Sequence, residues 1–294
     1  MSPDRHVGIE TVGGAARRVS FVGADQNTLV GDICGSIDGP TAIFLHGGGQ
    51  SRSSWRIAAQ RLGGDHFKTC AFDLRGHGDS DWSPNGDYRI DPFVADLVAV
   101  IEALGAPAIL VGASFGGHVS LVTAARYPSL ARALVLCDVT PWIEGEATKA
   151  MRAVMCTAAA GFASAQDAAN HIDAMRGFPS KLDANRLRKH MREDADGRLY
   201  WRWDPQFFLS QDTQDENLTE LLTAATADLK APTLLIRAEQ SEIVTPQQVS
   251  KFAQMVPHAR TAKVAGARHT VSAADNDRYA SLILGFLDDV RIRA

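Results

Sequence analysis

The stretch Ile109–Gly117, ILVGASFGG, runs from an apolar strand through a glycine-flanked serine into a helix. This pattern predicts a nucleophile elbow, a sharp strand-to-helix turn that raises a serine above a sheet. Gly112 and Gly116 stand two residues before and after Ser114, where a Cβ would collide with the crossing chain. Phe115 would begin the helix, so its N–H could meet a developing oxyanion. Alone, the motif also fits a tight turn that contains a serine by chance.

The composition is that of an ordinary globular protein. The 294 residues suit one α/β domain with an insertion, and 45% of them are hydrophobic and 22% charged. The formal charge of −4, from 30 basic and 34 acidic residues, gives no basic surface for nucleic acid or for a membrane. A small-molecule substrate is therefore the expected partner, and oligomeric state is not predicted.

The sequence carries no sign of export or of a bound metal. Its first twenty residues include several charges and no apolar block, and no apolar run approaches transmembrane length, so we expect a cytoplasmic protein. The four cysteines match neither a zinc site nor a disulfide framework in their spacing. We expect neither a metal nor a cofactor, and free buried thiols account for the cysteines.

A second glycine-rich segment lies upstream of the elbow. Two β-like runs within residues 18–34 predict an antiparallel hairpin, and the apolar run Thr41–Leu45 predicts a strand buried on both faces. The run ends in His46 and three glycines. Backbone N–H groups can approach a bound carbonyl oxygen where side chains are absent, so Gly48 is the expected second oxyanion donor. His46 is expected to form structural hydrogen bonds.

Strands and helices alternate around the elbow, which predicts a parallel sheet. This alternation of strands and helices stops after the strand at 131–138 and resumes with the strand at 232–237. Residues 140–229 show no buried β-like run, and they predict a helical cap over the carboxyl ends of the strands, where open sheets bind ligands. The core domain would then comprise residues 1–139 and 230–294.

At this point the chain resembles the α/β-hydrolase family with an inserted helical cap. The resemblance covers nearly the whole chain and rests on four motifs, each after a predicted strand: His46-Gly47, Asp73-Leu74-Arg75-Gly76-His77-Gly78, Gly112-x-Ser114-x-Gly116-Gly117 and Gly266-x-x-His269. It implies Ser114 as nucleophile and His269 as general base and then general acid. It also implies the N–H groups of Phe115 and Gly48 as the oxyanion hole.

The acid of the implied triad is where the sequence departs from the family. Related chains commonly carry an aspartate at the position that Ser241 occupies here. We choose the next residue, Glu242, because its extra methylene can absorb a small displacement. Asp138, at the end of the strand at 131–138, is an alternative location in the family, and Glu239 is a third candidate.

The resemblance implies a cofactor-independent serine hydrolase that cleaves an ester or lactone of a small, largely apolar molecule through an acyl-enzyme. Two alternatives stay open. Carbon–carbon bond hydrolysis of a diketone would use the same residues, and some proteins of this fold are small-molecule receptors without turnover. Haloalkane dehalogenases and epoxide hydrolases of the family carry an aspartate at the elbow, so Ser114 argues against both activities.

Overall fold

The structure is a computed structural model that describes residues 6–12, 16–65, 67–142, 153, 155–156, 160–176, 183–188, 191–214, 217–269 and 275–292. Its core strands are β1 (His6–Val12), β2 (Ala16–Val22), β3 (Thr28–Gly35), β4 (Thr41–Leu45), β5 (Lys68–Phe72), β6 (Ala108–Ala113), β7 (Ala131–Cys137), β10 (Thr233–Ala238) and β11 (Arg260–Val264). The helices that alternate with them are η1 (Arg52–Trp55), α1 (Arg56–Gly64), α2 (Ile90–Leu104), α3 (Phe115–Arg126), α9 (Pro246–Met255) and α10 (Asn276–Asp289).

These strands form one nine-stranded sheet in the order β1-β2-β3-β5-β4-β6-β7-β10-β11. The first three strands pair antiparallel, β3 pairs antiparallel with β5, and all later neighbours are parallel. The predicted α/β class, the hairpin and the parallel core are therefore confirmed. β1 was not predicted, and it extends the antiparallel edge by one strand.

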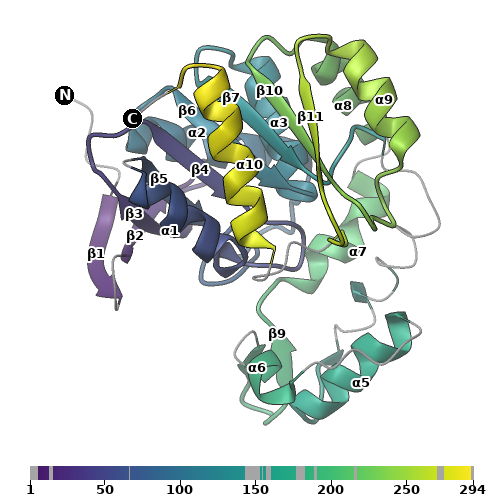
Figure 1. The fold of residues 1–294 in the computed structure, drawn as a ribbon. Coiled ribbons are helices and arrows are strands. Elements are labelled where there is room, and N and C mark those ends of the chain that lie inside the picture. Colours follow the sequence, from purple (N-terminus) through teal and green to yellow (C-terminus); the bar gives the residue numbers. More distant parts are fainter. Residues whose placement is uncertain are drawn as a thin grey trace.

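Helices cover both faces of the sheet (Figure 1). Side chains of β4 alternate between the two layers, as expected of a strand buried on both faces. Ala42 and Phe44 pack in a cluster with residues of α1 and α10, whereas Ile43 and Leu45 join the cluster that contains α2 and α3. This double burial holds the carboxyl ends of β4, β6 and β7 in a fixed relation.

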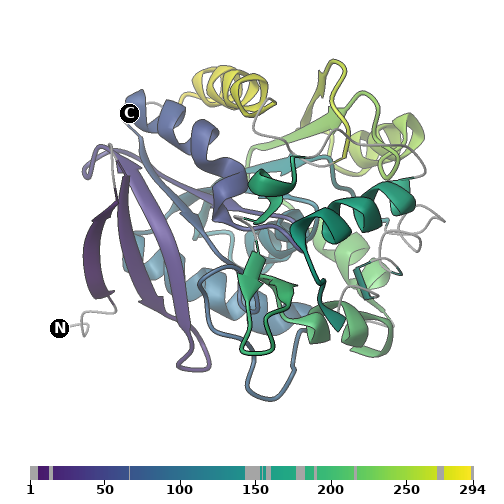
Figure 2. The same cartoon turned by 90° about the horizontal axis from the view of Figure 1, so that it is seen from below.

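The segment between β7 and β10 is not helical throughout. Its described elements are α5 (Ala165–Arg176), α6 (Ala184–Arg188), β8 (Met191–Glu193), β9 (Leu199–Trp201), α7 (Pro205–Gln214) and α8 (Leu218–Ala227). β8 and β9 form a small antiparallel sheet that the sequence analysis did not predict. Figures 1 and 2 show α5, α6 and β9 gathered at one end of the large sheet.

The last helix of this segment belongs with the core layer. α8 packs against α3, and its Leu222 is fully buried in the same cluster as the α3 residue Val119. α8 therefore belongs to the layer that covers the sheet, although its residues lie inside the range predicted for the cap. None of the described helices is long and apolar enough to cross a membrane.

Candidate active site

The elbow has the strand, turn and helix that its sequence predicts. β6 ends at Ala113 and α3 begins at Phe115, and between them Ser114 has φ 48° and ψ −123°. A Cβ at Gly112 would lie 2.4 Å from the carbonyl oxygen of Gly116. A Cβ at Gly116 would lie 2.5 Å from the carbonyl oxygen of His46. Both glycines are therefore required for the crossing of strand and helix, and the strained serine lies at its apex.

Ser114 belongs to a continuous chain of hydrogen bonds. The Oγ atom of Ser114 lies 3.3 Å from Nε2 of His269, and Nδ1 of His269 lies 2.8 Å from Oδ2 of Asp138. His269 follows β11, and Asp138 follows β7 and is fully buried. Because the carboxylate only accepts, Nδ1 carries the proton and Nε2 presents its lone pair to the serine hydroxyl. That arrangement can remove a proton from Ser114.

The Asp138 carboxylate is held by three donors. Its Oδ1 accepts from the N–H of Ala238 at 2.8 Å, and its Oδ2 accepts from Ser241 Oγ at 2.6 Å as well as from His269. The Ser241 hydroxyl in turn accepts from the N–H groups of Ile243 and Val244, at 3.2 and 2.9 Å. With its lone pairs engaged by two amides, Ser241 has its proton directed at Asp138.

The expectation that Glu242 lies against His269 was wrong. Glu242 is half-exposed and pairs with Arg268, whose Nε donates to it at 2.7 Å. Glu239, the third candidate, pairs with Lys263 at 2.7 Å and accepts from the N–H of Gly266 at 2.9 Å. The loop after β10 points these carboxylates outward, while the N–H of Asp138 bonds to Ile236 and brings the end of β7 under His269.

Asp138 could have been found from a different signal. It is the carboxylate that directly follows the run Ala131–Cys137, in which every residue except Arg132 is apolar. A charge placed where a buried strand ends needs partners to be stable. Ser241 carried no comparable signal, because an isolated serine is common in any loop.

The two predicted oxyanion donors lie on either side of Ser114. Phe115 is the first residue of α3, and Gly48 belongs to the turn after β4, whose Gly47 would place a Cβ 3.2 Å from the Cβ of Ser114. Within the described ranges, the N–H groups of Gly48 and Phe115 donate to no other group of the protein. Among the described residues, neither N–H therefore has an acceptor that would compete with a bound oxygen.

Two buried histidines link the glycine turn to the loop after β5. Nδ1–H of His46 donates to the carbonyl oxygen of Gly47 at 2.8 Å, and its Nε2 accepts from the N–H of Leu74 at 3.0 Å. Nε2 of His77 accepts from the N–H of Gly49 at 3.0 Å. Burial lowers the pKa of His46 to about 4 and that of His77 to about 3, so both are neutral near pH 7. The structural role expected for His46 agrees with these bonds.

The salt bridges of Arg52 stabilise the same loop after β5. Arg52 pairs with Asp73, which is fully buried, and with Asp32 and Asp79. Burial alone would lower the pKa of Arg52, but the neighbouring carboxylates outweigh it and raise the pKa. Arg75 forms two hydrogen bonds with Asp96, at 2.7 and 2.8 Å. These charges are compensated inside the scaffold and do not face Ser114.

Residues 202–204, which follow β9, pair with the loop after β5. The N–H of Gly78 donates to the carbonyl oxygen of Arg202 at 2.6 Å, and the N–H of Asp204 donates to that of Gly76 at 2.7 Å. The hydroxyl of Tyr88 donates to the Asp204 carboxylate at 2.6 Å. From here α7 places Phe207 and Phe208 over the glycine turn: a Cβ at Gly48 would lie 3.0 Å from Phe207.

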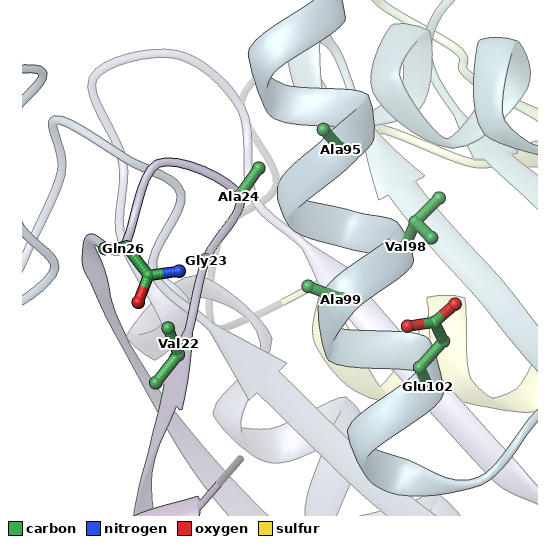
Figure 3. Close-up of a pocket in the computed structure, with 8 residues that line it drawn as sticks. All are labelled: Val22, Gly23, Ala24, Gln26, Ala95, Val98, Ala99 and Glu102. Carbon is green, nitrogen blue, oxygen red and sulfur yellow. The ribbon is translucent and has the colours of Figure 1, made fainter. Parts of the chain in front are cut away.

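Two further observations concern ligand sites elsewhere. A shallow pocket of about 250 Å³ lies between the turn after β2 and helix α2, and Figure 3 shows its lining, which includes Gln26 and Glu102. It contains none of the residues around Ser114. In the part of the chain that the structure describes, no three His, Cys, Asp or Glu side chains gather as metal ligands would.

Comparison with known proteins gives concordant results. Residues 40–273 match the family described as the alpha/beta hydrolase fold. The chain is 31% identical over 254 residues to 2-(acetamidomethylene)succinate hydrolase of Mesorhizobium japonicum, covering 85% of this chain and 88% of that protein. It is 29% identical over 260 residues to an esterase of Mycobacterium tuberculosis, covering 85% and 83%. A crystal structure of E-2-(acetamidomethylene)succinate hydrolase superposes with a TM-score of 0.75 at 29% identity, covering 93% of this chain and 98% of that one.

Proposed function

The chain belongs to the α/β-hydrolase fold family, and on that premise we propose that it is a serine hydrolase that cleaves an ester or lactone of a small, largely apolar molecule. Ser114 is the nucleophile, His269 the general base and acid, and Asp138 the acid that orients His269. The observation that carries the proposal is the chain of hydrogen bonds from Ser114 through His269 to the buried Asp138.

The reaction follows from the positions of these groups. Nε2 of His269 takes the proton of Ser114 Oγ as this oxygen attacks the substrate carbonyl carbon. The N–H groups of Phe115 and Gly48 bind the oxyanion of the tetrahedral intermediate. His269 then gives its proton to the leaving alkoxide, and an acyl group remains on Ser114. Water, deprotonated by His269, attacks the acyl carbon, and the carboxylic acid leaves as Ser114 regains its proton.

The surroundings of the glycine turn support an apolar substrate. Phe207 and Phe208 face Gly48, and the methyl group of Met155 approaches Gly49. A substrate whose carbonyl oxygen points at Gly48 would therefore have rings and a thioether as neighbours. These side chains favour apolar substituents next to the scissile bond. For a lactone, the alcohol and acid would leave as one molecule.

Hydrolysis of an N-acyl amide is the second candidate. One relative is named for 2-(acetamidomethylene)succinate, a substrate that contains an N-acetyl group. The same serine, histidine and aspartate would serve, because an amide and an ester pass through similar tetrahedral intermediates. The two reactions differ in the leaving group, because His269 protonates the departing nitrogen of an amide and the departing oxygen of an ester.

The first experiment treats the protein with a small fluorophosphonate and maps the adduct by peptide mass spectrometry, with Ser114→Ala as the control. We expect one adduct, on Ser114, that is absent from the variant. A panel of short-chain aryl esters, lactones, N-acetyl enamides and vinylogous diketones then separates the ester proposal from amide and carbon–carbon bond hydrolysis. An unlabelled protein that shows no turnover but binds small apolar molecules would overturn the proposal in favour of a receptor.

A further inference from the structure

The His77 side chain is positioned to act on the glycine turn and on nothing else in the proposed reaction. It is fully buried, and it lies on the loop after β5 rather than beside Ser114. Nδ1 of His77 lies 3.0 Å from the carbonyl oxygen of Arg75, so Nδ1 carries the proton. The lone pair of Nε2 therefore faces the N–H of Gly49, which donates to it at 3.0 Å.

The bond to Gly49 constrains the turn that carries Gly48. The turn closes with a hydrogen bond from the N–H of Gln50 to the carbonyl oxygen of Gly47 at 3.1 Å, which makes Gly48 and Gly49 its two central residues. Gly49 has φ +74°, a conformation that glycine adopts without steric penalty and can also leave easily. Two adjacent glycines have little intrinsic preference for one direction of their N–H groups, so an external acceptor is needed to fix them.

The cap holds His77 in place from the other side. His77 and Trp203 form an antiparallel bridge, made by the two backbone hydrogen bonds between residues 76–78 and 202–204. The ring of Phe207 meets the His77 ring edge to face, with centroids 4.7 Å apart. Phe207 also packs 5.0 Å from the ring of Phe115 and lies against Gly48. One aromatic ring of the cap thus touches both residues that supply the oxyanion N–H groups.

From these contacts we infer that His77 is a positioning residue, which holds the Gly48 N–H toward the oxyanion, and that the docked cap segment Trp203–Phe207 locks it there. The inference rests on the proposed function. Its consequence is that the cap does more than enclose substrate, because displacement of this segment would loosen the oxyanion hole while Ser114, His269 and Asp138 keep their geometry.

Two variants of His77 separate its two hydrogen bonds. In His77→Gln, the amide can place an oxygen near the former Nε2 and keep an acceptor for Gly49. In His77→Asn, the shorter amide can reach the Arg75 carbonyl oxygen but leaves the Gly49 N–H without its acceptor. We expect His77→Asn to lower kcat roughly 10- to 100-fold, less than the loss of a whole oxyanion donor. The kcat of His77→Gln should stay within about threefold of the wild-type value, because the glutamine amide oxygen still accepts from the Gly49 N–H.

Two inhibitors distinguish oxyanion binding from general damage. A trifluoromethyl ketone forms a hemiketal oxyanion with Ser114, whereas an ether analogue of the substrate binds without one. In His77→Asn, the ketone should lose affinity by about the factor lost in kcat, while the ether binds unchanged. His77→Leu, which also lacks an acceptor for the Gly49 N–H, should show the same pattern and serves if His77→Asn fails to fold by circular dichroism.

The outcomes are distinguishable from those of the proposed function. If the wild-type protein neither reacts with the fluorophosphonate nor hydrolyses any ester or amide, the proposed function fails and this inference fails with it. If the wild type is active but a folded His77→Asn, or His77→Leu in its place, loses ketone and ether affinity equally, or loses neither, His77 is only a packing residue. Selective loss of ketone affinity, restored in His77→Gln, supports the inference.

Discussion

At the scale of single residues, the identity of the acid can be tested with a matched pair of variants. Asp138→Asn keeps the shape of the side chain but offers His269 a neutral partner, which favours the wrong tautomer. We expect kcat to fall roughly 10³- to 10⁴-fold, measured with the best ester of the panel. Glu242→Gln, which only breaks the half-exposed pair with Arg268, should stay within about twofold. A larger loss in Glu242→Gln than in Asp138→Asn would return the acid to the loop after β10.

Ser241 offers a second test at this scale. Its hydroxyl donates to the same Asp138 oxygen that binds His269, and a hydrogen bond to a charged group contributes about 1.5–3 kcal/mol. We expect Ser241→Ala to lower kcat about tenfold or more, because the carboxylate loses a fixed donor. Ser241→Thr retains the hydroxyl and should keep most of the activity. Equal rates in both variants and the wild type would show that Ala238 and His269 suffice to hold Asp138.

Single residues also show where prediction from the sequence stops. Ser114, His269, Gly48 and Phe115 are predicted from local motifs, because each lies in a glycine-bearing segment after a strand, and the structure places Ser114 Oγ 3.3 Å from Nε2 of His269. The sequence gives Asp138 only as one of three candidate acids, because a position after a buried strand does not say which carboxylate meets His269. Asp138 reaches His269 only because β7 lies beside β10, and two strands that are far apart in sequence become neighbours through long-range packing.

At the scale of an element, the elbow depends on its lack of side chains. In Gly112→Ala the new Cβ would lie 2.4 Å from the Gly116 carbonyl oxygen, a backbone atom that cannot rotate away. We expect the free energy of unfolding to fall by about 3 kcal/mol, measured by urea denaturation. The control is Gly285→Ala on the exposed face of α10, where nothing lies within 4 Å of a Cβ. That variant should gain about 0.5–1 kcal/mol. A stable Gly112→Ala would contradict the tight crossing.

The elements themselves were predictable where they are long and periodic. The parallel strands and α2 follow from runs of apolar residues with the right spacing. β8 and β9 have three residues each, and nothing so short is stable by its own propensity. β9 also pairs outside this small sheet, because Leu199 and Phe162 exchange two backbone hydrogen bonds of 2.8 Å, a long-range pairing that no local pattern reveals.

At the scale of the whole molecule, three buried histidines make stability depend on pH. Burial lowers the pKa of His46 and His118 to about 4 and that of His77 to about 3, from an ordinary value of 6.5. Below pH 6.5 these three histidines are therefore protonated in the unfolded chain but remain neutral in the folded chain. Their contribution to the free energy of unfolding is fully present above pH 6.5. It decreases as the pH falls toward 4, by up to about 1.4 kcal/mol per pH unit for each histidine.

Urea denaturation at pH 7.5, 6.5, 5.5 and 5.0 measures this dependence. His118 serves as the probe because its Nε2–H bonds to the Thr140 carbonyl oxygen rather than to the glycine turn. In His118→Gln the slope of unfolding free energy against pH should decrease by about one proton. Stability that does not change between pH 6.5 and 5.0 would mean that these imidazoles become protonated without unfolding.

The order of the strands separates the synthesis of Ser114 from the synthesis of His269. Gly48, Ser114, Phe115 and Asp138 all precede residue 139, whereas His269 comes after β11, the last strand of the described sheet. A ribosome therefore synthesises Ser114 and Asp138 well before the imidazole. On the proposed mechanism the nascent chain carries an inert hydroxyl, and chemistry begins only when the final strand has added itself to the edge of the sheet.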